Sequence, residues 1–367
     1  MSKVLFLSNH FITLYSFRRE FVKRLVDEGH EVILSLPEDP DNKFFEDMGC
    51  KIIITPIDRR GVNPVKDLKL ITFYKKMIKN VAPDIVYSYT IKPNIYGALA
   101  INKKFKQICT ITGLGTFFVE KSFITPIAIF LYQISIPRAY KVFFQNTYDR
   151  DVFIRHHMVG KRYEVIPGSG CNLKEFVPLS MPEGEKIRFL YIGRVMRQKG
   201  IDTYLEAAKR IREKYPNTEF IIAGWNEDAE YKPIVEDYMN KGYVNYIGFR
   251  KDIKDWIRDT HCTVLPSFGE GIPNVILESA ASARPCIGSD IPGHFATIED
   301  GVTGYIFKTK DADSLTEVLE KFIRLSTEER TQMGLKGREK MEREFDRQIV
   351  IQKYMDELNL EDKDGKH

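Results

Sequence analysis

The sequence predicts an α/β protein made of two Rossmann-like domains, each with a doubly wound parallel sheet. Three observations lead to this fold class. The chain has 367 residues, which is long for one hydrophobic core and fits two domains of about 150 to 200 residues. Short apolar strands alternate with amphipathic helices in two successive series. Between the series, residues 167–186 are rich in Pro and Gly and follow neither period, as is typical of a linker.

The first series predicts a domain over residues 1–168. Its helical stretches are about 10 to 15 residues long and lie between most of the strands, which favours parallel pairing. We expect strands at 3–8, 31–36, 51–54, 84–88, 107–112 and 140–145.

The second series follows the linker, 169–186, and predicts a domain over 187–344. A helix at 199–214 has Ile201, Tyr204, Leu205, Ala208 and Ile211 on one stripe. A charged helical segment, 329–359, ends the series, and we expect a helix at 345–360 to pack back on the first domain. Ligands of such sheets bind at the carboxyl ends of the strands, so the loops there are searched for function. We expect strands at 187–194, 218–223, 243–247, 262–265, 285–288 and 304–307.

The composition is that of a soluble globular protein, with 29% charged and 43% hydrophobic residues. The five cysteines are scattered, without a C-x-x-C pair or a His at ligand spacing. This pattern predicts neither a disulfide framework nor a zinc site, and it fits a reducing cytoplasm. The first residues, MSKVLFLSNHF, lack the long apolar region of a signal peptide.

Charge is divided unevenly along the chain. Residues 1–170 contain 25 Lys and Arg against 16 Asp and Glu, a net of +9, whereas the remainder contains 30 against 35. A basic first half can meet nucleic acid, an acidic membrane surface or a diphosphate. No nucleic-acid motif supports the first option. The apolar stretch 122–137 is too short to span a bilayer, and it is interpreted either as a buried helix or as a helix face that touches lipid.

The segment YIGRVMRQKGID, 191–202, gathers cations at the end of a strand. Gly193 allows a close backbone approach, and Arg194, Arg197 and Lys199 precede the start of a helix near Gly200. Helix N-termini favour anions, so this loop is suited to a diphosphate. The alternative is a solvated basic turn.

The segment SFGEGIPNVILE, 267–278, brings two carboxylates to a second loop. Gly269 and Gly271 bracket Glu270, Pro273 is expected at the first position of a helix, and Glu278 lies about two turns further on. Ionised carboxylates accept hydrogen bonds from hydroxyls, which suits a polyhydroxylated ligand. The alternative is a helix-terminal charge at Glu270 and an internal salt bridge at Glu278.

These segments resemble those of the retaining GT-B glycosyltransferases of family 4. EGIPNVILE is similar to the family's E-x7-E signature, GRVMRQKG to its G-R-x4-K-G segment, and SDIPGHFATIEDGVTGYIF, 289–307, to the segment that follows. The first-half segments FLSNHFITLYSFRREFVKRLVDEGHEV and YTIKPNIYGALA resemble bacterial enzymes that extend undecaprenyl-diphosphate-linked sugars, such as bacillosamine N-acetylgalactosaminyltransferases and capsule or O-antigen enzymes. The resemblance implies a GT-B fold with two domains facing a cleft.

The resemblance also implies roles for individual residues. Arg194 and Lys199 would hold the donor diphosphate, Glu270 the transferred sugar and Glu278 the ribose, so that Glu270, Arg194 and Lys199 are the expected catalytic groups. The remaining donor-binding residues would be Gly193, Phe249, Arg250, Gly271, Ile272 and Pro273. On charge and loop position, the expected acceptor-binding residues are Asn9, Tyr15, Arg18 and Lys92, with Thr112 and Gly113 at the position where many family members have a His.

The expected activity is a retaining transfer from a UDP-sugar, such as a UDP-N-acetylhexosamine, to a lipid-diphosphate-linked saccharide. No D-x-D motif stands in a suitable loop, so we expect no metal and no cofactor. We expect a cytoplasmic protein at the inner face of the membrane. Two alternatives are a non-hydrolysing UDP-sugar 2-epimerase and a non-catalytic scaffold subunit of a polysaccharide assembly complex. His294 is either structural or a contact of the donor sugar.

Overall fold

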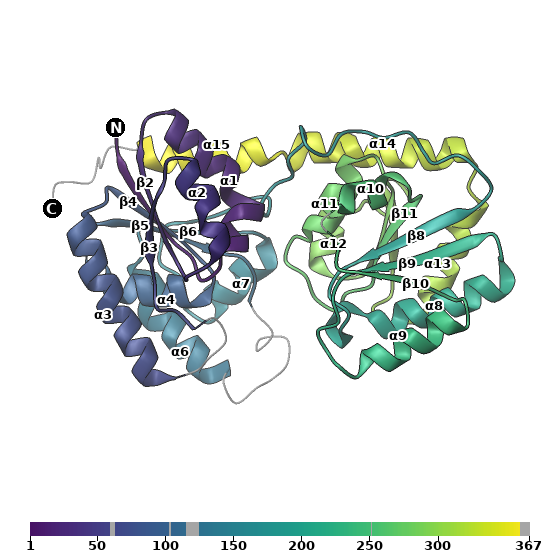
Figure 1. Ribbon diagram of the computed structural model, residues 1–367, viewed down its shortest axis with the longest axis horizontal. Helices are drawn as coiled ribbons and strands as arrows, with labels where there is room; N and C mark the ends of the chain where they lie inside the picture. The colour runs from purple at the N-terminus through teal and green to yellow at the C-terminus, as the bar shows by residue number, and fades with distance from the viewer. Residues whose placement is uncertain (59–62, 103, 115–124, 251, 360–367) are drawn as a thin grey trace. The chain divides into compact units, whose positions relative to one another are not determined.

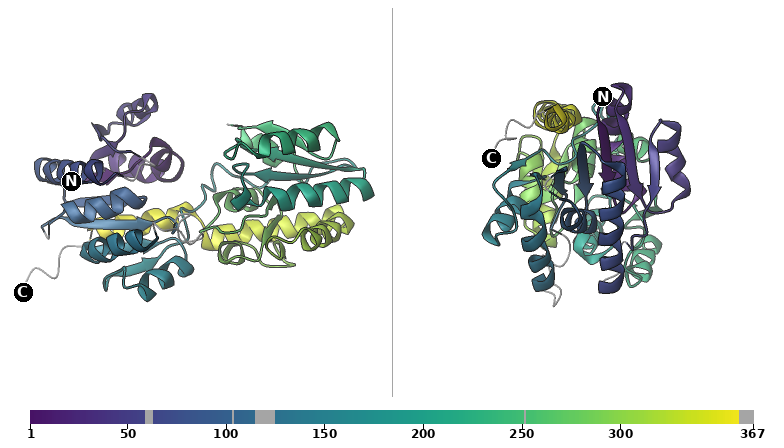
Figure 2. Two further views of the ribbon diagram at one scale, coloured as in Figure 1. Left: turned by 90° about the horizontal axis from the view of Figure 1, so that it is seen from below. Right: turned by 90° about the vertical axis from the view of Figure 1, so that its left-hand side faces the viewer.

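The computed structural model describes residues 1–58, 63–102, 104–114, 125–250 and 252–359, and these divide into two compact units (Figure 1). The first unit comprises Met1–Ser169 together with the segment that starts at Val350, and the second comprises Gly170–Ile349. Each unit contains one parallel sheet with helices on both faces, as Figures 1 and 2 show. The predicted α/β class with two doubly wound parallel sheets is confirmed.

The sheet of the first unit has the strand order β3-β2-β1-β4-β5-β6-β7, and every neighbouring pair is parallel. The order changes direction between β1 and β4, which makes their carboxyl ends the topological switch point. The sequence predicted six of these strands and missed β7. The strands are β1 (Lys3–Leu7), β2 (Glu31–Leu36), β3 (Lys51–Ile54), β4 (Ile85–Tyr89), β5 (Lys106–Ile111), β6 (Lys141–Phe144) and β7 (Tyr163–Val165).

Alternating strand residues of the first unit build two cores. Val4 and Phe6 of β1 join the core beneath one layer of helices, and Leu5 and Leu7 join the core beneath the other. This is the period of two that a strand imposes on its side chains. The helical elements are α1 (Phe11–Asp27), η1 (Pro40–Asn42), α2 (Lys43–Asp47), α3 (Pro64–Val81), α4 (Ile91–Ala100), α6 (Thr125–Ser135), η2 (Ile136–Arg138), α7 (Thr147–Arg155) and α15 (Arg347–Asn359).

Helix α15 packs on the first sheet although it is the last helix of the chain. Tyr354 is fully buried, its hydroxyl lies 2.9 Å from Oγ1 of Thr110, and its carbonyl accepts a hydrogen bond from the Tyr87 hydroxyl at 2.6 Å. The C-terminal helix is therefore part of the core of the first unit.

Helix α6 is buried on one face only. Ala128, Tyr132 and Ser135 are buried, whereas Ile127, Phe130 and Ile134 are 56, 57 and 41% exposed. The interpretation of this apolar stretch as a wholly buried helix is therefore wrong for residues 125–135, and residues 122–124 lie outside the described ranges. None of the helices in those ranges is long and apolar enough to cross a membrane.

The sheet of the second unit has the strand order β10-β9-β8-β11-β12-β13, again with parallel pairs, and its switch point lies between β8 and β11. The strands are β8 (Ile187–Ile192), β9 (Thr218–Ala223), β10 (Asn245–Gly248), β11 (Cys262–Leu265), β12 (Cys286–Ser289) and β13 (Gly304–Phe307). The helical elements are η3 (Arg197–Lys199), α8 (Ile201–Lys214), α9 (Tyr231–Asn240), α10 (Ile253–Arg258), α11 (Asn274–Ala281), α12 (Pro292–Thr297), α13 (Ala312–Arg324) and α14 (Thr327–Glu344).

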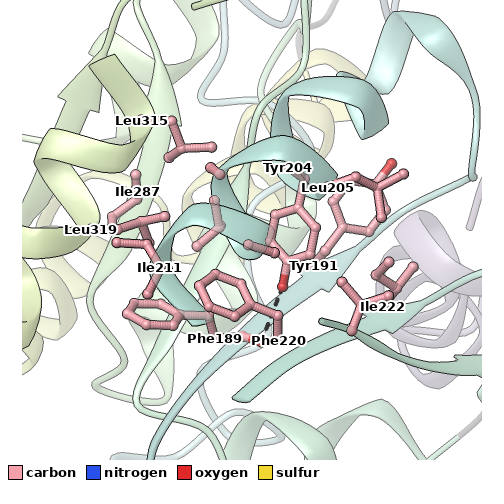
Figure 3. Close-up of a cluster of buried hydrophobic side chains, with 14 of the residues drawn as sticks. Phe189, Tyr191, Tyr204, Leu205, Ile211, Phe220, Ile222, Ile287, Leu315 and Leu319 are labelled. Atoms are coloured by element: carbon pink, nitrogen blue, oxygen red, sulfur yellow. Dashed lines mark hydrogen bonds between the residues drawn. The ribbon is translucent and has the colours of Figure 1, made fainter. Parts of the chain in front are cut away.

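The apolar stripe predicted for 199–214 is buried in one core of this unit, although the α-helix itself starts at Ile201. Figure 3 shows Tyr204, Leu205 and Ile211 of α8 against the sheet. The Tyr204 hydroxyl lies within hydrogen-bond distance, 3.1 Å, of the backbone carbonyls of Phe189 and Ile221, which belong to two neighbouring strands. With these acceptors the hydroxyl has a partner, so the tyrosine can be fully buried.

Much of the segment predicted as a linker, 169–186, is packed on the second unit. Cys171 and Phe176 belong to a core of that unit. Arg284 is buried and donates to the carbonyls of Leu179 and Ser180 at 2.9 and 2.8 Å. The same guanidinium also donates to the carbonyls of residues 257 and 258, so it joins the segment to the region around α10.

We predict that Arg284→Met destabilises the second unit by about 3 kcal/mol, because four buried carbonyls lose a charged donor. The measurement is the free energy of urea unfolding of the full chain, with the exposed Arg258→Met as the matched control. Equal stabilities of the two variants would contradict the role given to Arg284.

Candidate functional site

The loops that follow β8 and β11 meet at the switch point of the second sheet. Gly200 has φ +70°, and a Cβ placed on it would overlap the carbonyl oxygen of Pro266. The amide of Phe268 donates to the carbonyl of Gln198 at 2.9 Å. The two motif segments that the sequence singled out are therefore in direct contact, and glycine is required at position 200.

An ion pair joins the two loops. Nζ of Lys199 donates to Oε1 of Glu270, and the Ser267 hydroxyl donates to the same oxygen at 2.7 Å. The side chains of Lys199 and Glu270 are 22 and 14% exposed. Burial by itself would raise the pKa of Glu270, but the charge of Lys199 and the hydrogen bonds from Lys199 and Ser267 outweigh it and hold that pKa below its usual value. Glu270 is therefore an ionised carboxylate at neutral pH.

Arg194 extends the positive charge of this edge towards solvent. Its guanidinium is half-buried and lies 3.5 Å from the carboxylate of Glu227. Its carbonyl accepts a hydrogen bond from the buried Tyr191 hydroxyl at 2.7 Å, which fixes its backbone directly after Gly193. The sequence prediction that Arg194 and Lys199 share one edge is confirmed, since both follow β8, but Lys199 is already paired with a carboxylate.

The second half of the E-x7-E segment forms α11. Pro273 is the N-cap of this helix rather than its first residue, so the prediction for Pro273 was wrong by one position. Gly271 lies against the start of α12, where a Cβ on Gly293 would overlap the Gly271 carbonyl. Ile272 is buried, and Glu278 is partly buried on α11. The two glutamates thus stand on one loop-and-helix unit, and both are partly buried.

The carboxyl ends of β9 and β10 expose two aromatic rings. Trp225 and Phe249 are 46 and 58% exposed, and their ring centroids lie 5.1 Å apart. The Trp225 indole N–H donates to Glu227 at 2.9 Å, which connects it to the carboxylate that faces Arg194. Arg250 is engaged by both oxygens of Asp252, at 2.9 and 2.8 Å.

The sequence analysis missed Trp225. A signal was available, because Gly224 and Trp225 directly follow a strand at the edge where ligands bind. A Cβ on Gly224 would overlap the carbonyl of Gly193, so the loop after β9 lies against the loop after β8. Ser267 was also missed although it begins the segment 267–278 that the sequence analysis singled out, and Glu227 was missed because no motif surrounds it.

In the first unit, two of the residues proposed for the acceptor are part of the aromatic packing. Arg18 is buried, with its guanidinium carbon 4.8 Å from the ring centroid of Tyr89 and 5.4 Å from that of Tyr354. Tyr15 is half-buried against Phe11 and Phe44. Among the described residues no carboxylate forms an ion pair with Arg18; its guanidinium lies against the aromatic faces of Tyr89 and Tyr354 and donates to the carbonyl of Phe17 at 2.8 Å.

The other four residues proposed for the acceptor lie at or after the carboxyl ends of β1, β4 and β5. Nζ of Lys92 is 3.0 Å from Oδ1 of Asp67, and both side chains are only 14% exposed. Lys92 is therefore neutralised by a neighbour. Asn9 follows β1, and the exposed Thr112 and the partly buried Gly113 (φ +143°) follow β5.

Within the described ranges, no group of three or more His, Cys, Asp and Glu residues could hold a metal ion. Arg194, Lys199 and the exposed Arg197 of the loop after β8 are cations that this edge of the second sheet offers to an anion.

Two family models match the chain, one on each side of residue 170. The model described as "Glycosyl transferase 4-like" matches residues 3–146, and the model described as "Glycosyl transferases group 1" matches residues 176–340.

Two curated relatives are similar to this chain over most of its length. An N,N'-diacetylbacillosaminyl-diphospho-undecaprenol alpha-1,3-N-acetylgalactosaminyltransferase of Campylobacter jejuni is 28% identical, over 95% of this chain and 96% of its own. A UDP-Gal:alpha-D-GlcNAc-diphosphoundecaprenol alpha-1,3-galactosyltransferase of Escherichia coli is 26% identical, over 80% of each chain.

Solved structures share the fold. The HepE protein of Anabaena in complex with UDP and glucose superposes with a TM-score of 0.78 and 16% identity, covering 98% of this chain and 99% of its own. The sucrose-phosphate synthase of Thermosynechococcus elongatus gives a TM-score of 0.80 with 19% identity and 98% coverage of each chain. The predicted GT-B fold is confirmed by these likenesses.

We predict that Lys199→Met lowers the free energy of unfolding by about 3 kcal/mol at pH 7, because it leaves the Glu270 carboxylate buried without its cation. Since the folded pKa of Glu270 lies below the usual 4.5, the contribution of the pair is complete above that value and is lost as the pH falls through the folded pKa. The difference between wild type and variant in urea unfolding should therefore shrink from pH 7 towards about pH 3.

The matched control is Lys241→Met, which removes the exposed partner of Asp237. Exposed pairs of this kind contribute about 0.3 to 0.5 kcal/mol. A Lys199→Met effect as small as that of Lys241→Met would contradict the assignment.

Proposed function

We propose that this chain, a GT-B glycosyltransferase, moves a sugar from a UDP-sugar to a lipid-diphosphate-linked saccharide. Its first half matches the glycosyl transferase 4-like model and its second half the glycosyl transferases group 1 model. The observation that supports the donor half of this proposal is the Lys199–Glu270 pair beside Arg194, at the switch point of the second sheet. It combines cations for a diphosphate with a carboxylate for sugar hydroxyls.

The donor would lie across the loops after β8, β9, β10 and β11. Arg194 and Lys199 would bind the diphosphate, with Gly193 allowing a close backbone approach. Glu270 would accept hydrogen bonds from the transferred sugar and Glu278 from the ribose. The backbone of residues 271–273 would face the phosphates at the start of α11. The base would stack on the exposed rings of Trp225 and Phe249, next to Arg250. Uracil is supported by the UDP complex of the Anabaena relative.

Catalysis would come from groups that bind the leaving diphosphate more tightly as its charge grows. Arg194 and Lys199 can do this without a metal ion, since both are fixed before the reaction, Lys199 by Glu270 and the Arg194 backbone by Tyr191. We propose a metal-independent reaction on this ground. Retention of configuration is inferred from the resemblance to family 4.

The proposed acceptor is an undecaprenyl-diphosphate-linked saccharide, in the assembly of a glycan, capsule or O-antigen. Support comes from the names of the Campylobacter jejuni and Escherichia coli relatives, both of which act on diphosphate-linked undecaprenol sugars. Asn9, Tyr15, Arg18, Lys92, Thr112 and Gly113 are the proposed acceptor-binding residues. Lys92 would exchange Asp67 for the acceptor diphosphate.

An acidic membrane surface is the proposed partner of the first unit, at the cytoplasmic face. Ile127, Phe130 and Ile134 expose an uncharged apolar face on α6. Helix α3 packs with α6 against α4 and has five exposed lysines: Lys66, Lys69, Lys75, Lys76 and Lys79. Apolar side chains beside a row of cations have the composition that binds acidic lipid headgroups.

The donor assignment predicts selective stabilisation by UDP. Among UDP, GDP, CMP and dTDP, UDP should raise the midpoint of thermal unfolding, because binding at about 100 times the dissociation constant adds roughly 2.7 kcal/mol. Arg194→Ala and Glu278→Ala should each abolish the shift, whereas Arg258→Ala, which removes an exposed arginine paired with Asp255, should keep it. Absence of a shift with every nucleotide would overturn the donor site.

Transfer is tested separately. A UDP-sugar that binds should be consumed only when a lipid-diphosphate-linked saccharide is present. Interconversion of the sugar nucleotide without acceptor would instead support the 2-epimerase.

The membrane proposal predicts sedimentation with vesicles of phosphatidylcholine and 30% phosphatidylglycerol at low salt, and less sedimentation at high salt. Phe130→Ser with Ile134→Ser should reduce the bound fraction at both salt concentrations, and Lys75→Glu with Lys76→Glu should reduce it mainly at low salt. Leu335→Ser, on the exposed face of α14, is the control. Unchanged binding of both double variants would contradict the surface.

A further inference from the structure

His294 stands at the start of α12, next to the loop that holds Glu270. It is fully buried. The neighbouring Gly293 is so close to the loop that a Cβ would overlap the carbonyl of Gly271. The charges of Glu270 and Lys199 both act on the imidazole. The ring is therefore part of the edge described above, although it is 24 residues beyond Glu270 in the sequence.

The hydrogen bonds of Ser289 fix the tautomer of His294. Nδ1 lies 2.9 Å from the Ser289 carbonyl oxygen and 3.2 Å from the Ser289 hydroxyl. That hydroxyl donates its hydrogen to the carbonyl of Ser267, and a carbonyl oxygen can only accept. Nδ1 therefore has the proton and Nε2 has a lone pair. Burial lowers the pKa of His294 to about 4, against the opposing charge of Glu270, so the ring is neutral at pH 7.

Nε2 of His294 is buried and has no hydrogen-bond partner among the described residues. A buried acceptor without a partner costs about 1 to 3 kcal/mol. A second histidine of this unit, His261, is also buried, and burial lowers its pKa to about 4 as well. Unlike His294, it has hydrogen-bond partners: its Nδ1 accepts from the amide of Arg188 at 3.2 Å, and its ring forms a hydrogen bond with the backbone of Pro182. Burial alone therefore does not account for the open acceptor of His294.

A neutral acceptor close to an ionised carboxylate matches a ligand with several hydroxyls. Glu270 Oε1 is occupied by Lys199 and Ser267, and the second carboxylate oxygen and the imidazole lone pair can each accept one O–H. A phosphate without protons has no hydrogen to offer Nε2, whereas a sugar hydroxyl has.

We propose that Nε2 of His294 accepts a hydrogen bond from one hydroxyl of the donor sugar and so helps to select which sugar is transferred. The proposal rests on the proposed function, since it places the sugar of the nucleotide at Glu270. It adds a specificity-determining residue outside the E-x7-E segment, held in one orientation by Ser289.

The test compares wild type with His294→Asn and His294→Gln by calorimetry. The asparagine amide can keep the bond to Ser289 and lacks an atom at the Nε2 position, whereas the glutamine oxygen can reach it. The first probe is UDP. The second, the parent sugar nucleotide, is whichever of UDP-glucose, UDP-galactose, UDP-N-acetylglucosamine and UDP-N-acetylgalactosamine binds wild type most tightly. The remaining probes are the 3-, 4- and 6-deoxy forms of this parent sugar nucleotide. UDP should bind all three proteins equally.

His294→Asn should bind the parent sugar nucleotide about 10-fold more weakly than wild type does, which is the effect of one hydrogen bond. One deoxy form should show the same loss with wild type and no further loss with His294→Asn, and His294→Gln should recover part of the affinity. The control His261→Asn should lower thermal stability and leave every affinity ratio unchanged.

Two results are decisive against the proposal. Equal weakening of the parent and of all deoxy forms by His294→Asn would assign the ring a purely structural role, with UDP binding and the proposed function intact. Failure of wild type to bind UDP would instead remove the proposed function itself, and the inference with it.

Discussion

One partly buried ion pair joins the two loops at the switch point of the second sheet. Lys199 and Glu270 are 71 residues apart in sequence and come from loops after different strands. A carboxylate as little exposed as that of Glu270 would be costly without a cation and hydrogen bonds, and the pair supplies both. Because each loop provides one charge, the pair holds the two loops together, in addition to the backbone contacts of Gly200 with Pro266 and of Phe268 with Gln198. The pair therefore sets the geometry of the edge before any ligand arrives.

A hydrogen-bonded chain continues from this pair into the protein. Ser267 binds Glu270, Ser289 binds the carbonyl of Ser267, and His294 binds Ser289. Each member is buried, so none can be replaced by water without rearrangement. Close backbone contacts at Gly200 and Gly293 leave no room for side chains between the three loops. A site built in this way is rigid, which suits the fixed electrostatic environment that the proposed sugar transfer would require.

In the first unit, two cations near the switch point are already in contact with neighbouring side chains. Arg18 is surrounded by the rings of Tyr89 and Tyr354, and Lys92 is paired with Asp67. Tyr354 comes from α15, so the environment of Arg18 is completed by a residue 336 positions further along the chain. Five exposed lysines of this unit lie on α3, on the same side of the sheet as the apolar face of α6. Other exposed cations, such as Lys23, Lys43 and Lys51, are spread over further elements of the unit.

The sequence by itself determined the fold class, nearly all strands and the two loops that form the candidate site. Strand and helix periods, and the positions of Gly, Arg, Lys and Glu after strands, are local properties. Only the tertiary structure decided which charges meet. Lys199 was predicted as a cation for phosphate and is already bound to Glu270, while Lys92 is bound to Asp67. The hydrogen bonds of Ser267 and the open nitrogen of His294 were likewise beyond local inference, whereas Trp225 was missed although its position directly after a strand gave a local signal. Burial and hydrogen-bond partners are set by contacts between segments far apart in the chain, and no local pattern encodes those distances.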